Sequence, residues 1–518
     1  MSDATICLLV LAVVIVLFVW NQLPVEIVAV GSAIALWAAG VLPAGDVFAG
    51  FGDPVIAFIA GLFIVSEGLN VAGVTTWAGQ QLARRAGDQP RRLLVATMVL
   101  AALLAALISV NGATAALLPM VVLLAVRLRR SPSTMAMPLA FAGHAGSLLV
   151  LTATPINLLI SQAAADAGGR PFGFFEYAQV GIPLVIGTIA ITVLLGARLL
   201  PQRTPRSLPP DLGGHARTLA QHYQLNQKPI TKSLGAAEVI LTPRSPLVGD
   251  RVYPGMPTDS GELVILAIHR AGESLGEDPV TLAPGDTLLV QGSWQALERQ
   301  ISVEGGVVVV DAPAAVRRQA IPLGPGAARA TAVLVAMIIL LATGLIPPAI
   351  AAVVAGGAMI VTRVITMRQA YHGISWTTLV IVAGMIPLSV AMQQSGAADT
   401  LAHLIVTAFG ASGMLLLLGL FLLTVTLGQV ISNTATALIV IPIGAAAAGE
   451  VGVAVQPVMM CIGVAAAASF LTPIATAANL MVKEPGGYRF GDYWRLGLPL
   501  VAWFLAVAVL LVPVLWPL

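Results

Sequence analysis

The stretch RRLLVATMVLAALLAALISVNGATAALLPMVVLLAVRLRR, residues 91–130, has two apolar arms joined by a polar tip, with arginines at both ends. Lysine and arginine accumulate on the cytoplasmic side of membrane proteins, so both ends are predicted to be cytoplasmic. A segment that enters and leaves the bilayer on one face is a re-entrant hairpin, whose broken tip is tolerated only inside protein or beside a cavity. The alternative is two full spans with a tight external turn.

The composition of the whole chain agrees with a membrane location. Of 518 residues, 58% are hydrophobic and 10% are charged, which excludes an ordinary soluble fold. The net charge of +2 does not indicate nucleic acid as a partner, and Cys7 and Cys461 are too far apart in sequence to indicate a disulfide framework or a metal cluster. No nucleophile, base and orienting group form a recognisable pattern, so we expect no enzymatic activity.

Apolar runs of about 20 residues predict the membrane spans. They are expected near residues 5–20, 26–42, 54–72, 134–165, 174–199, 329–345, 347–363, 374–392, 455–483 and 493–516. The stretch QVISNTATALIVIPI, residues 429–443, contains the polar tip of a second hairpin, and no basic residue lies near either end of that hairpin. This hairpin is therefore predicted to enter from the outside.

An offset of 322 residues (433 − 111) relates polar positions in the two halves of the chain. It superimposes Asn111 on Asn433, Thr114 on Thr436, Ser147 on Ser469, Thr154 on Thr476 and Asn157 on Asn479. With five spans and one hairpin in each half, the second half must be inverted relative to the first, as in many secondary transporters. If both termini lie outside, counting the crossings places the basic residues other than Arg170 on the cytoplasmic side.

Hydropathy drops between the two halves, which predicts an inserted domain. The expected divisions are a first transmembrane repeat at 1–200 with its hairpin near 92–128, a linker at 201–220, a cytoplasmic regulatory module at 221–311, a linker at 312–328, and a second transmembrane repeat at 329–518 with its hairpin near 412–448. In the module, AAEVIL, ELVILAIHR and DTLLVQG predict strands, and SWQALERQ predicts a helix capped by Ser293. The fold class is therefore a polytopic α-helical membrane protein with a small α/β insert.

The words TPRSPLVGDRV, LVILAIHRAGE and LAPGDTLLVQGS, in that order, resemble the C-terminal module of regulator-of-potassium-conductance proteins over residues 225–303. The resemblance implies a module that dimerises and in some members binds a small cytosolic ligand. We therefore expect a homodimer with a regulatory module. A dimerisation or folding element without a ligand is the alternative.

The membrane halves carry a second resemblance. The motifs SNTATA (432–437), TPIATAAN (472–479), VNGATA (110–115) and TATPIN (152–157) make the chain similar to the divalent-anion/sodium symporter family of the ion transporter superfamily. In that family, two hairpin tips hold the substrate at mid-membrane, and nearby carbonyl groups bind sodium. The resemblance implies symport of Na⁺ with a small divalent anion, sulfate-like or a short dicarboxylate, by alternating access in the lipid of the plasma membrane.

The resemblance also implies which residues form the two kinds of site. For the substrate they are Asn111, Gly112, Thr154, Pro155, Ser432, Asn433, Thr434, Thr476 and Ala477. For sodium, mostly through backbone carbonyls, they are Ala106, Val110, Asn111, Ala153, Gly428, Ile431, Asn433 and Ala475. The first tip departs from the family pattern, because Val110, Asn111 and Gly112 stand where Ser-Asn-Thr is usual, which leaves the identity of the anion open.

The residue chemistry is consistent with this role. Hard cations take oxygen ligands, and half-helix N-termini present free N–H groups to anions. The alternative is that the polar tips merely cap helices or join neighbouring helices. Two ionisable residues have an undecided role: Glu67 is either functional or a hydrogen-bonded structural carboxyl, and His144 either lines the path or is a neutral packed histidine.

Two other functional classes fit the sequence less well. A potassium channel or transporter governed by the module would need a carbonyl-lined filter such as TVGYG, and the sequence contains none. A membrane sensor would need an output domain, and none is recognisable. Sodium-coupled anion symport is therefore the leading prediction.

Overall fold

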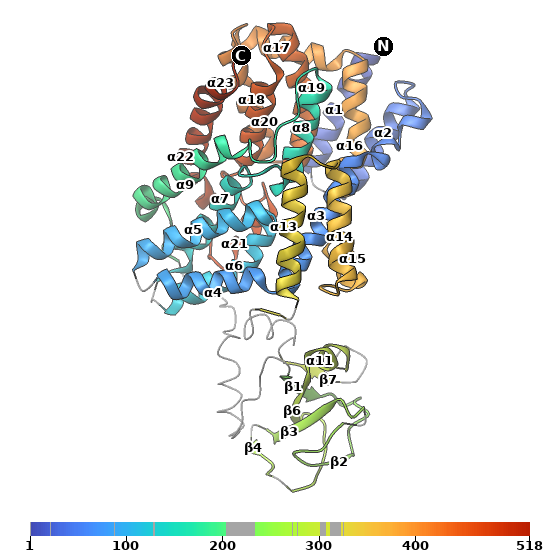
Figure 1. Cartoon of the computed structure of the whole chain (residues 1–518), viewed down its shortest axis with the longest axis vertical. Helices are drawn as coiled ribbons and strands as arrows, with labels where there is room; N and C mark the ends of the chain where they lie inside the picture. The colour runs from blue at the N-terminus through green and yellow to red at the C-terminus, as the bar shows by residue number, and fades with distance from the viewer. Residues whose placement is uncertain are drawn as a thin grey trace. The chain divides into compact units, whose positions relative to one another are not determined.

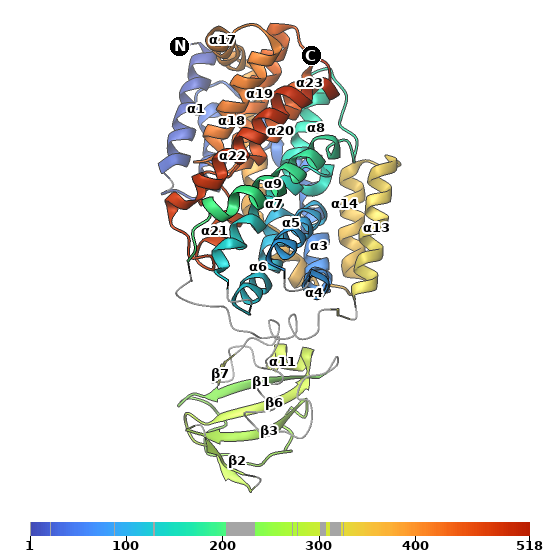
Figure 2. The ribbon, with the colours of Figure 1, turned by 90° about the vertical axis from the view of Figure 1, so that its left-hand side faces the viewer.

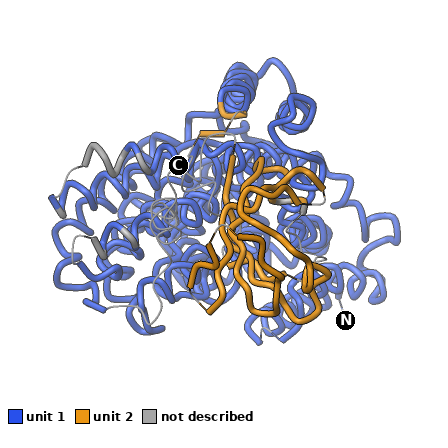
Figure 3. Tube along the Cα trace, turned by 90° about the horizontal axis from the view of Figure 1, so that it is seen from below, with its two compact units in different colours: residues 1–209, 328–518 blue, residues 210–327 orange. Residues whose placement is uncertain are grey.

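The computed structural model describes residues 2–20, 22–86, 89–127, 130–203, 234–300 without 259, 272 and 277, 307–310, and 323–518 without 325. The chain forms two compact units, residues 1–209 with 328–518 and residues 210–327, coloured separately in Figure 3. The first unit is helical and mostly apolar. The second is built around a β-sheet.

The helices of the first unit follow one another in two series (Figures 1 and 2). The first series comprises α1 (Asp3–Trp20), α2 (Val25–Ala38), α3 (Pro54–Val71), α4 (Val74–Ala86), α5 (Pro90–Leu107), α6 (Val110–Arg127), α7 (Ala136–Gly146), α8 (Pro155–Asp166) and α9 (Ala178–Leu199). The second comprises α13 (Ala327–Thr343), α14 (Pro348–Val361), α15 (Met367–Gly373), α16 (Trp376–Gln394), α17 (Ala397–Phe409), α18 (Gly413–Gly428), α19 (Asn433–Val451), α20 (Val455–Ala467), α21 (Ala477–Lys483), α22 (Tyr493–Ala506) and α23 (Val512–Leu515). Short 3₁₀ turns η1 to η5 connect some of them (Ala44–Asp46, Ala49–Gly52, Pro132–Thr134, Leu151–Ala153, Phe490–Asp492), and a π-helical stretch, Val507–Leu511, joins α22 to α23.

Several helices have the length and hydropathy needed to cross a bilayer. Among the described residues these are α1, α3, α9, α16, α19 and the continuous segment Phe490–Leu515, while α2, α13, α14 and α20 are shorter apolar helices. Helices α17 and α18 meet at an angle of 112°, as in a broken span or a re-entrant segment. The prediction of a polytopic α-helical membrane protein is confirmed.

Two predicted spans are broken. The segment near 134–165 consists of α7 and α8, separated by residues 147–154, and the segment near 455–483 consists of α20 and α21, separated by residues 468–476. Helix α21 packs against α6 and α7, and α8 packs against α19 and α20. Each broken helix therefore contacts elements from both series.

Close helix contacts occur in corresponding pairs. A Cβ at Gly61 of α3 would lie 2.5 Å from the carbonyl carbon of Ala352 in α14, and a Cβ at Gly384 of α16 would lie 3.0 Å from the carbonyl carbon of Ala29 in α2. Each glycine lets two backbones approach closely, as is common between membrane helices. Both glycines and both alanines are 323 residues apart (384 − 61 and 352 − 29), so the two contacts correspond.

The second unit contains a five-stranded antiparallel sheet. Its strand order is β4 (Glu273–Ser274), β3 (Leu263–Arg270), β6 (Thr287–Ser293), β1 (Leu234–Leu241) and β7 (Val307–Val309). A smaller sheet pairs β2 (Arg251–Val252) with β5 (Val280–Thr281). The predicted strands correspond to β1, β3 and β6, and Ser293 caps α11 (Trp294–Gln300) by accepting a hydrogen bond from the Ala296 backbone N–H at 3.1 Å. Apolar side chains from these strands and α11 form a core of their own.

Asp286 anchors the turn between β5 and β6. Its buried carboxylate accepts hydrogen bonds from Arg270 Nε at 2.7 Å, from Arg270 Nη2 at 2.8 Å and from the Ala283 N–H at 2.8 Å. The Arg270 guanidinium, helped by the Ala283 N–H, lowers the pKa of the Asp286 carboxyl. Because the folded-state pKa lies below the unfolded value, this pair stabilises the fold above the unfolded pKa, and the stabilisation is lost as pH falls through the folded pKa.

We therefore expect Asp286→Asn to raise the amide hydrogen exchange of β6 in the full-length protein about tenfold at pH 7, since a charge-assisted hydrogen bond is lost. In the parent, exchange corrected for the intrinsic pH effect should rise as pH drops below about 4, and the variant should lose that acid dependence. The exposed Asp250 provides the matched control, Asp250→Asn. Equal exchange in the Asp286 and Asp250 variants would show that the pair does not stabilise the unit.

Residues 201–203, which follow α9, form hydrogen bonds with residues of both series of helices. Arg203 Nη1 donates to Asp492 Oδ2 at 2.5 Å, and the Arg203 N–H donates to Ser133 Oγ at 3.0 Å. Ser133 Oγ donates to the Pro201 carbonyl at 2.5 Å, and the Tyr488 hydroxyl donates to the Ser133 carbonyl. Ser133 precedes α7, and Asp492 precedes α22.

Candidate functional site: hairpin tips and helix breaks

Both tips begin their second arm with a serine cap. Ser109 Oγ accepts a hydrogen bond from the Gly112 N–H at 3.1 Å, and Ser432 Oγ accepts one from the Ala435 N–H at 3.4 Å. A serine in this position satisfies a backbone N–H that the helix leaves free. At the fixed offset of 322, Val110 would occupy the serine position of the first tip. The structure instead supplies the serine one residue earlier, at Ser109.

In the second tip, Asn433 is held by the neighbouring helix break. Ser469 Oγ donates to Asn433 Oδ1 at 2.7 Å. Gly428, the last residue of α18, faces the same space, since a Cβ there would lie 3.8 Å from Asn433 Oδ1 and 3.9 Å from Thr436 Oγ1. The structure therefore brings the predicted residues Gly428 and Asn433 together.

Gln429 joins the second tip to the break between α20 and α21. Its Nε2 donates to the carbonyls of Val425 and Ala468, both at 3.2 Å, and its Oε1 accepts from the Leu471 N–H at 2.9 Å. The Gln429 carbonyl also accepts from Thr472 Oγ1 at 2.8 Å. No pattern in the sequence had singled out Gln429.

The first tip is held differently. The counterpart of Gln429 is Leu107, whose side chain is 43% exposed. The counterpart of Ser469 is Ser147, which donates to the carbonyl of His144 in its own helix at 2.7 Å, and the Asn111 side chain is exposed. Both tips therefore have a serine cap, but the polar side chains around them form different hydrogen bonds.

Thr114 and Thr436 occupy corresponding positions in the second turns of α6 and α19. Both side chains are buried, and neither hydroxyl oxygen has a hydrogen-bond partner among the residues that the structure describes. A buried polar group without a partner is costly. The hydroxyls of Thr97, Thr188 and Thr192 share this state among the described residues, and what distinguishes Thr114 and Thr436 is their corresponding position beside the two tips. The offset in the sequence had paired these two threonines, but their burial was not foreseen.

The helix breaks are closed by two corresponding asparagines. Asn157 Nδ2 donates to the carbonyls of Ser147 and Val150 at 2.8 and 3.0 Å. Asn479 Nδ2 donates to the carbonyls of Ser469 and Thr472 at 2.7 and 3.1 Å. These amides satisfy carbonyl groups that the interrupted helices leave free. Tyr177 and Tyr493 in turn donate to the backbone carbonyls of Asn157 and Asn479 at 2.6 and 2.7 Å.

His144 connects the two breaks. It is buried in α7, and its Nε2 lies 3.2 Å from Asn479 Oδ1 and 3.1 Å from Thr476 Oγ1. Its ring stands edge-to-face against Phe470. Glu67, the other ionisable residue with an undecided role, lies in α3, where its Cβ would be 2.6 Å from a Cβ at Gly373 of α15.

The remaining predicted residues lie at the helix ends around these contacts. Thr154 and Thr476 are the N-caps of α8 and α21, Pro155 and Ala477 are the first residues of those helices, Val110 begins α6, and Thr434 is half-buried in the first turn of α19. Ala106, Ala153, Ile431 and Ala475 are buried beside the tips and breaks. The Gly112 N–H is used by the Ser109 cap.

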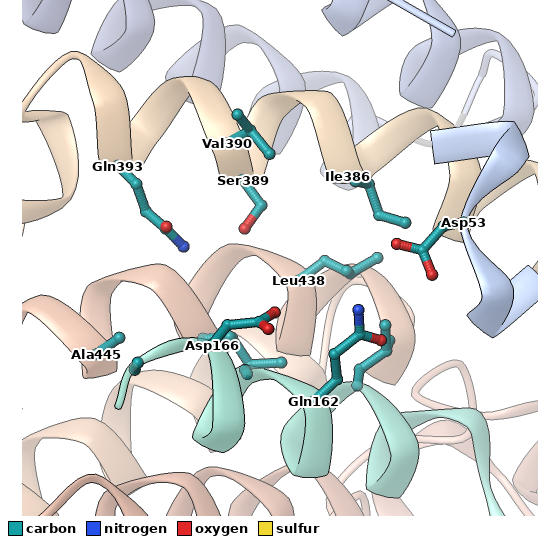
Figure 4. A pocket seen from close by; sticks show the side chains of 13 residues that line it. Asp53, Gln162, Asp166, Ile386, Ser389, Val390, Gln393, Leu438 and Ala445 are labelled. Atoms are coloured by element: carbon teal, nitrogen blue, oxygen red, sulfur yellow. The ribbon is translucent and has the colours of Figure 1, made fainter. Parts of the chain in front are cut away.

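A cavity of about 240 Å³ lies between α8, α16 and α19. Its polar side chains are Asp53, Gln162, Asp166, Ser389 and Gln393. Figure 4 shows Ser389 pointing from α16 towards Asp166 of α8, with Asp53 and Gln162 at the other end of the cavity. The cavity lies beside later turns of the helices that begin at Pro155 and Asn433, and no sequence motif had indicated it.

The chain is similar to several known transporters. A family model described as CitMHS, citrate transporter, matches residues 15–458 and 338–518. The uncharacterized transporter YfbS of Escherichia coli (strain K12) is 31% identical, over 98% of each chain. The probable sodium/sulfate cotransporter 3 of Chlamydomonas reinhardtii is 25% identical, over 51% of this chain and 30% of that protein. The solved YdaH transporter of Alcanivorax borkumensis has a similar fold, with a TM-score of 0.52 at 14% identity, covering 99% of this chain and 97% of that one.

Proposed function

This chain belongs to the citrate transporter (CitMHS) family of secondary transporters, and we propose from this premise that it carries a small divalent anion, sulfate-like or a short dicarboxylate, in symport with sodium. Membership in a transporter family also confirms that the protein is a multi-pass membrane transporter and not an enzyme. Two sodium/sulfate cotransporters of Chlamydomonas reinhardtii match about half of the chain, which supports the choice of ions.

The observation that carries the proposal is the pair of buried, unpartnered hydroxyls of Thr114 and Thr436. Thr436 Oγ1 faces the same space beside Gly428 as Asn433 Oδ1 does. Neutral oxygens of this kind, together with carbonyls freed at a helix break, suit a hard monovalent cation such as Na⁺. We assign one sodium to each tip, beside these hydroxyls. The residues proposed to hold it, mostly through backbone carbonyls, are Ala106, Val110, Asn111 and Ala153 in the first tip, and Gly428, Ile431, Asn433 and Ala475 in the second.

The anion is proposed to bind between the two tips. Its ligands are Asn111, Gly112, Thr154, Pro155, Ser432, Asn433, Thr434, Thr476 and Ala477. The long helices α6 and α19 begin at these tips, and their N-termini favour negative charge. Sodium bound at the same tips adds positive charge nearby, which explains why the two ions would be carried together.

Alternating access is proposed to follow from two inverted repeats. The corresponding contacts of Gly61 with Ala352 and of Gly384 with Ala29 support this. Each contact pairs a glycine of one series of helices with an alanine of the other series. The positions of basic residues support termini outside and the insert in the cytoplasm. A homodimer and a regulatory ligand of the insert are proposed from the sequence resemblance alone.

The proposal predicts sodium coupling without a requirement for protons, since the tip residues offer neutral oxygens. In proteoliposomes, sulfate or succinate uptake should rise at least tenfold when an inward Na⁺ gradient is imposed, and a pH gradient in sodium-free buffer should not replace it. Choline in place of sodium is the control for the membrane potential. Equal uptake driven by the pH gradient alone would overturn sodium coupling.

A further inference from the structure

One buried side chain makes the two helix breaks unequal. His144 in α7 contacts Asn479 and Thr476, whereas its counterpart at the offset of 322 is Ala466. Asn157, the counterpart of Asn479, is fully buried, and its Oδ1 has no hydrogen-bond partner within the described part of the chain. The His144 side chain therefore provides a hydrogen-bonding group at the second break, and Ala466 provides none at the corresponding position of the first break.

The surroundings of Asn479 fix the role of this histidine. Both hydrogen bonds of Asn479 Nδ2 go to carbonyl oxygens, so the amide orientation is determined and Oδ1 faces His144. An amide oxygen only accepts hydrogen bonds. His144 Nε2 must therefore carry a hydrogen and donate it towards Asn479 Oδ1.

The same hydrogen determines how Thr476 bonds. A ring nitrogen that carries a hydrogen has no in-plane lone pair with which to accept a hydrogen bond. Thr476 Oγ1, 3.1 Å away, can therefore only accept from it, sharing the hydrogen with Asn479 Oδ1. Thr476 Oγ1 also accepts from the Asn479 backbone N–H at 3.2 Å. A hydroxyl oxygen has two lone pairs, and both are now used. The hydroxyl hydrogen of Thr476 remains to be donated to another group.

We propose that His144 is a positioning residue that makes Thr476 an obligate hydrogen-bond donor to the transported anion. The inference rests on the proposed function, in which Thr476 is a substrate ligand. The substrate oxygen bound by Thr476 is then an unprotonated acceptor, as in sulfate or an ionised carboxylate. Thr154 in the first break accepts from the Ile156 N–H at 3.4 Å and has Ala466 at the position corresponding to His144, so its hydroxyl is not fixed in this way.

Binding titrations of sulfate and of succinate to the purified protein in sodium test the proposal. His144→Phe keeps a ring of similar size without the donor and should weaken affinity about tenfold, since the Thr476 hydroxyl can turn towards Asn479. The sodium concentration for half-saturation should change less than twofold. His144→Gln, which restores an N–H donor, should recover most of the affinity.

A double-mutant cycle separates positioning from general packing. Thr476→Val should cost about tenfold in the parent and little in the His144→Phe background, whereas Thr154→Val should cost the same in both. Additive effects of His144→Phe and Thr476→Val would overturn the proposal. If His144→Phe does not fold, nitrogen-15 NMR of labelled histidine, assigned with His144→Gln, still reports the tautomer, and a hydrogen on Nδ1 alone would overturn it.

Anion binding by the parent protein distinguishes failure of the proposed function from failure of the inference about His144. If the parent binds neither sulfate nor succinate in sodium, the proposed function fails and this inference fails with it. If the parent binds an anion and His144→Phe binds it equally well, this inference alone fails.

Discussion

Replacing Gln429 by leucine is expected to open the break between α20 and α21. The variant loses the side-chain bonds to Ala468 and Leu471 across the break and leaves both backbone groups without those partners. Each buried polar group left unpaired costs about 1–3 kcal/mol, so the loss for the two groups should be about 2–6 kcal/mol in total. Amide exchange of peptides covering 468–476 should accelerate roughly thirtyfold or more, and sodium-dependent anion binding should weaken strongly, because Asn433 is held by Ser469 in that segment.

The first half of the chain provides a matched control. Leu107 is the counterpart of Gln429 and is partly exposed, so Leu107→Gln introduces the same polar group without breaking any bond. Exchange in the first break, residues 147–154, should change less than threefold in that variant. If Gln429→Leu leaves exchange at 468–476 unchanged, the Gln429 bonds do not hold the break closed.

Asn433→Ala is expected to weaken the binding of sodium and anion together, each about tenfold to a hundredfold. The substitution removes an oxygen proposed to serve both ions and leaves the Ser469 hydroxyl without this partner. Titration of one ion at several fixed concentrations of the other on the purified variant measures both effects. The thermal stability of the ion-free variant shows whether the fold is preserved.

Asn111→Ala is the informative comparison for this prediction. The Asn111 side chain is exposed, and Ser147 bonds to the carbonyl of His144, so the substitution does not deprive Ser147 of its partner. Its effect should therefore be smaller than that of Asn433→Ala. Parent-like binding of both ions by Asn433→Ala would mean that the second tip only joins helices.

The elements that the sequence predicted correctly depend on local patterns. The lengths of apolar runs predicted the apolar helices, and polar interruptions predicted the tips, because unpaired backbone groups in an apolar chain need polar neighbours. The two helix breaks lie inside segments that were predicted as spans. Period-two patterns in the insert located β1, β3 and β6. The helix α4 was not recognised, although it lies 323 residues before α17 (397 − 74) and repeats its place in the series.

What the sequence did not predict depends on contacts between distant residues. The bonds of His144 to Asn479 and of Gln429 to Leu471 join residues that no local pattern relates. A fixed offset also concealed Ser109, because the first tip has one residue more than the second between its serine and its asparagine. The corresponding positions of Thr114 and Thr436 were visible in the sequence, but their burial and their lack of hydrogen-bond partners among the described residues were seen only in the structure.

The attachment of residues 201–203 has a mechanical consequence. A pull on the chain beyond Arg203 is resisted first by its ion pair with Asp492 and its bond to Ser133, so the force is delivered at the starts of α7 and α22. Helix α7 leads directly to a break, and α22 packs against α9. Tension applied to the chain at Arg203 would therefore reach the start of a broken helix directly.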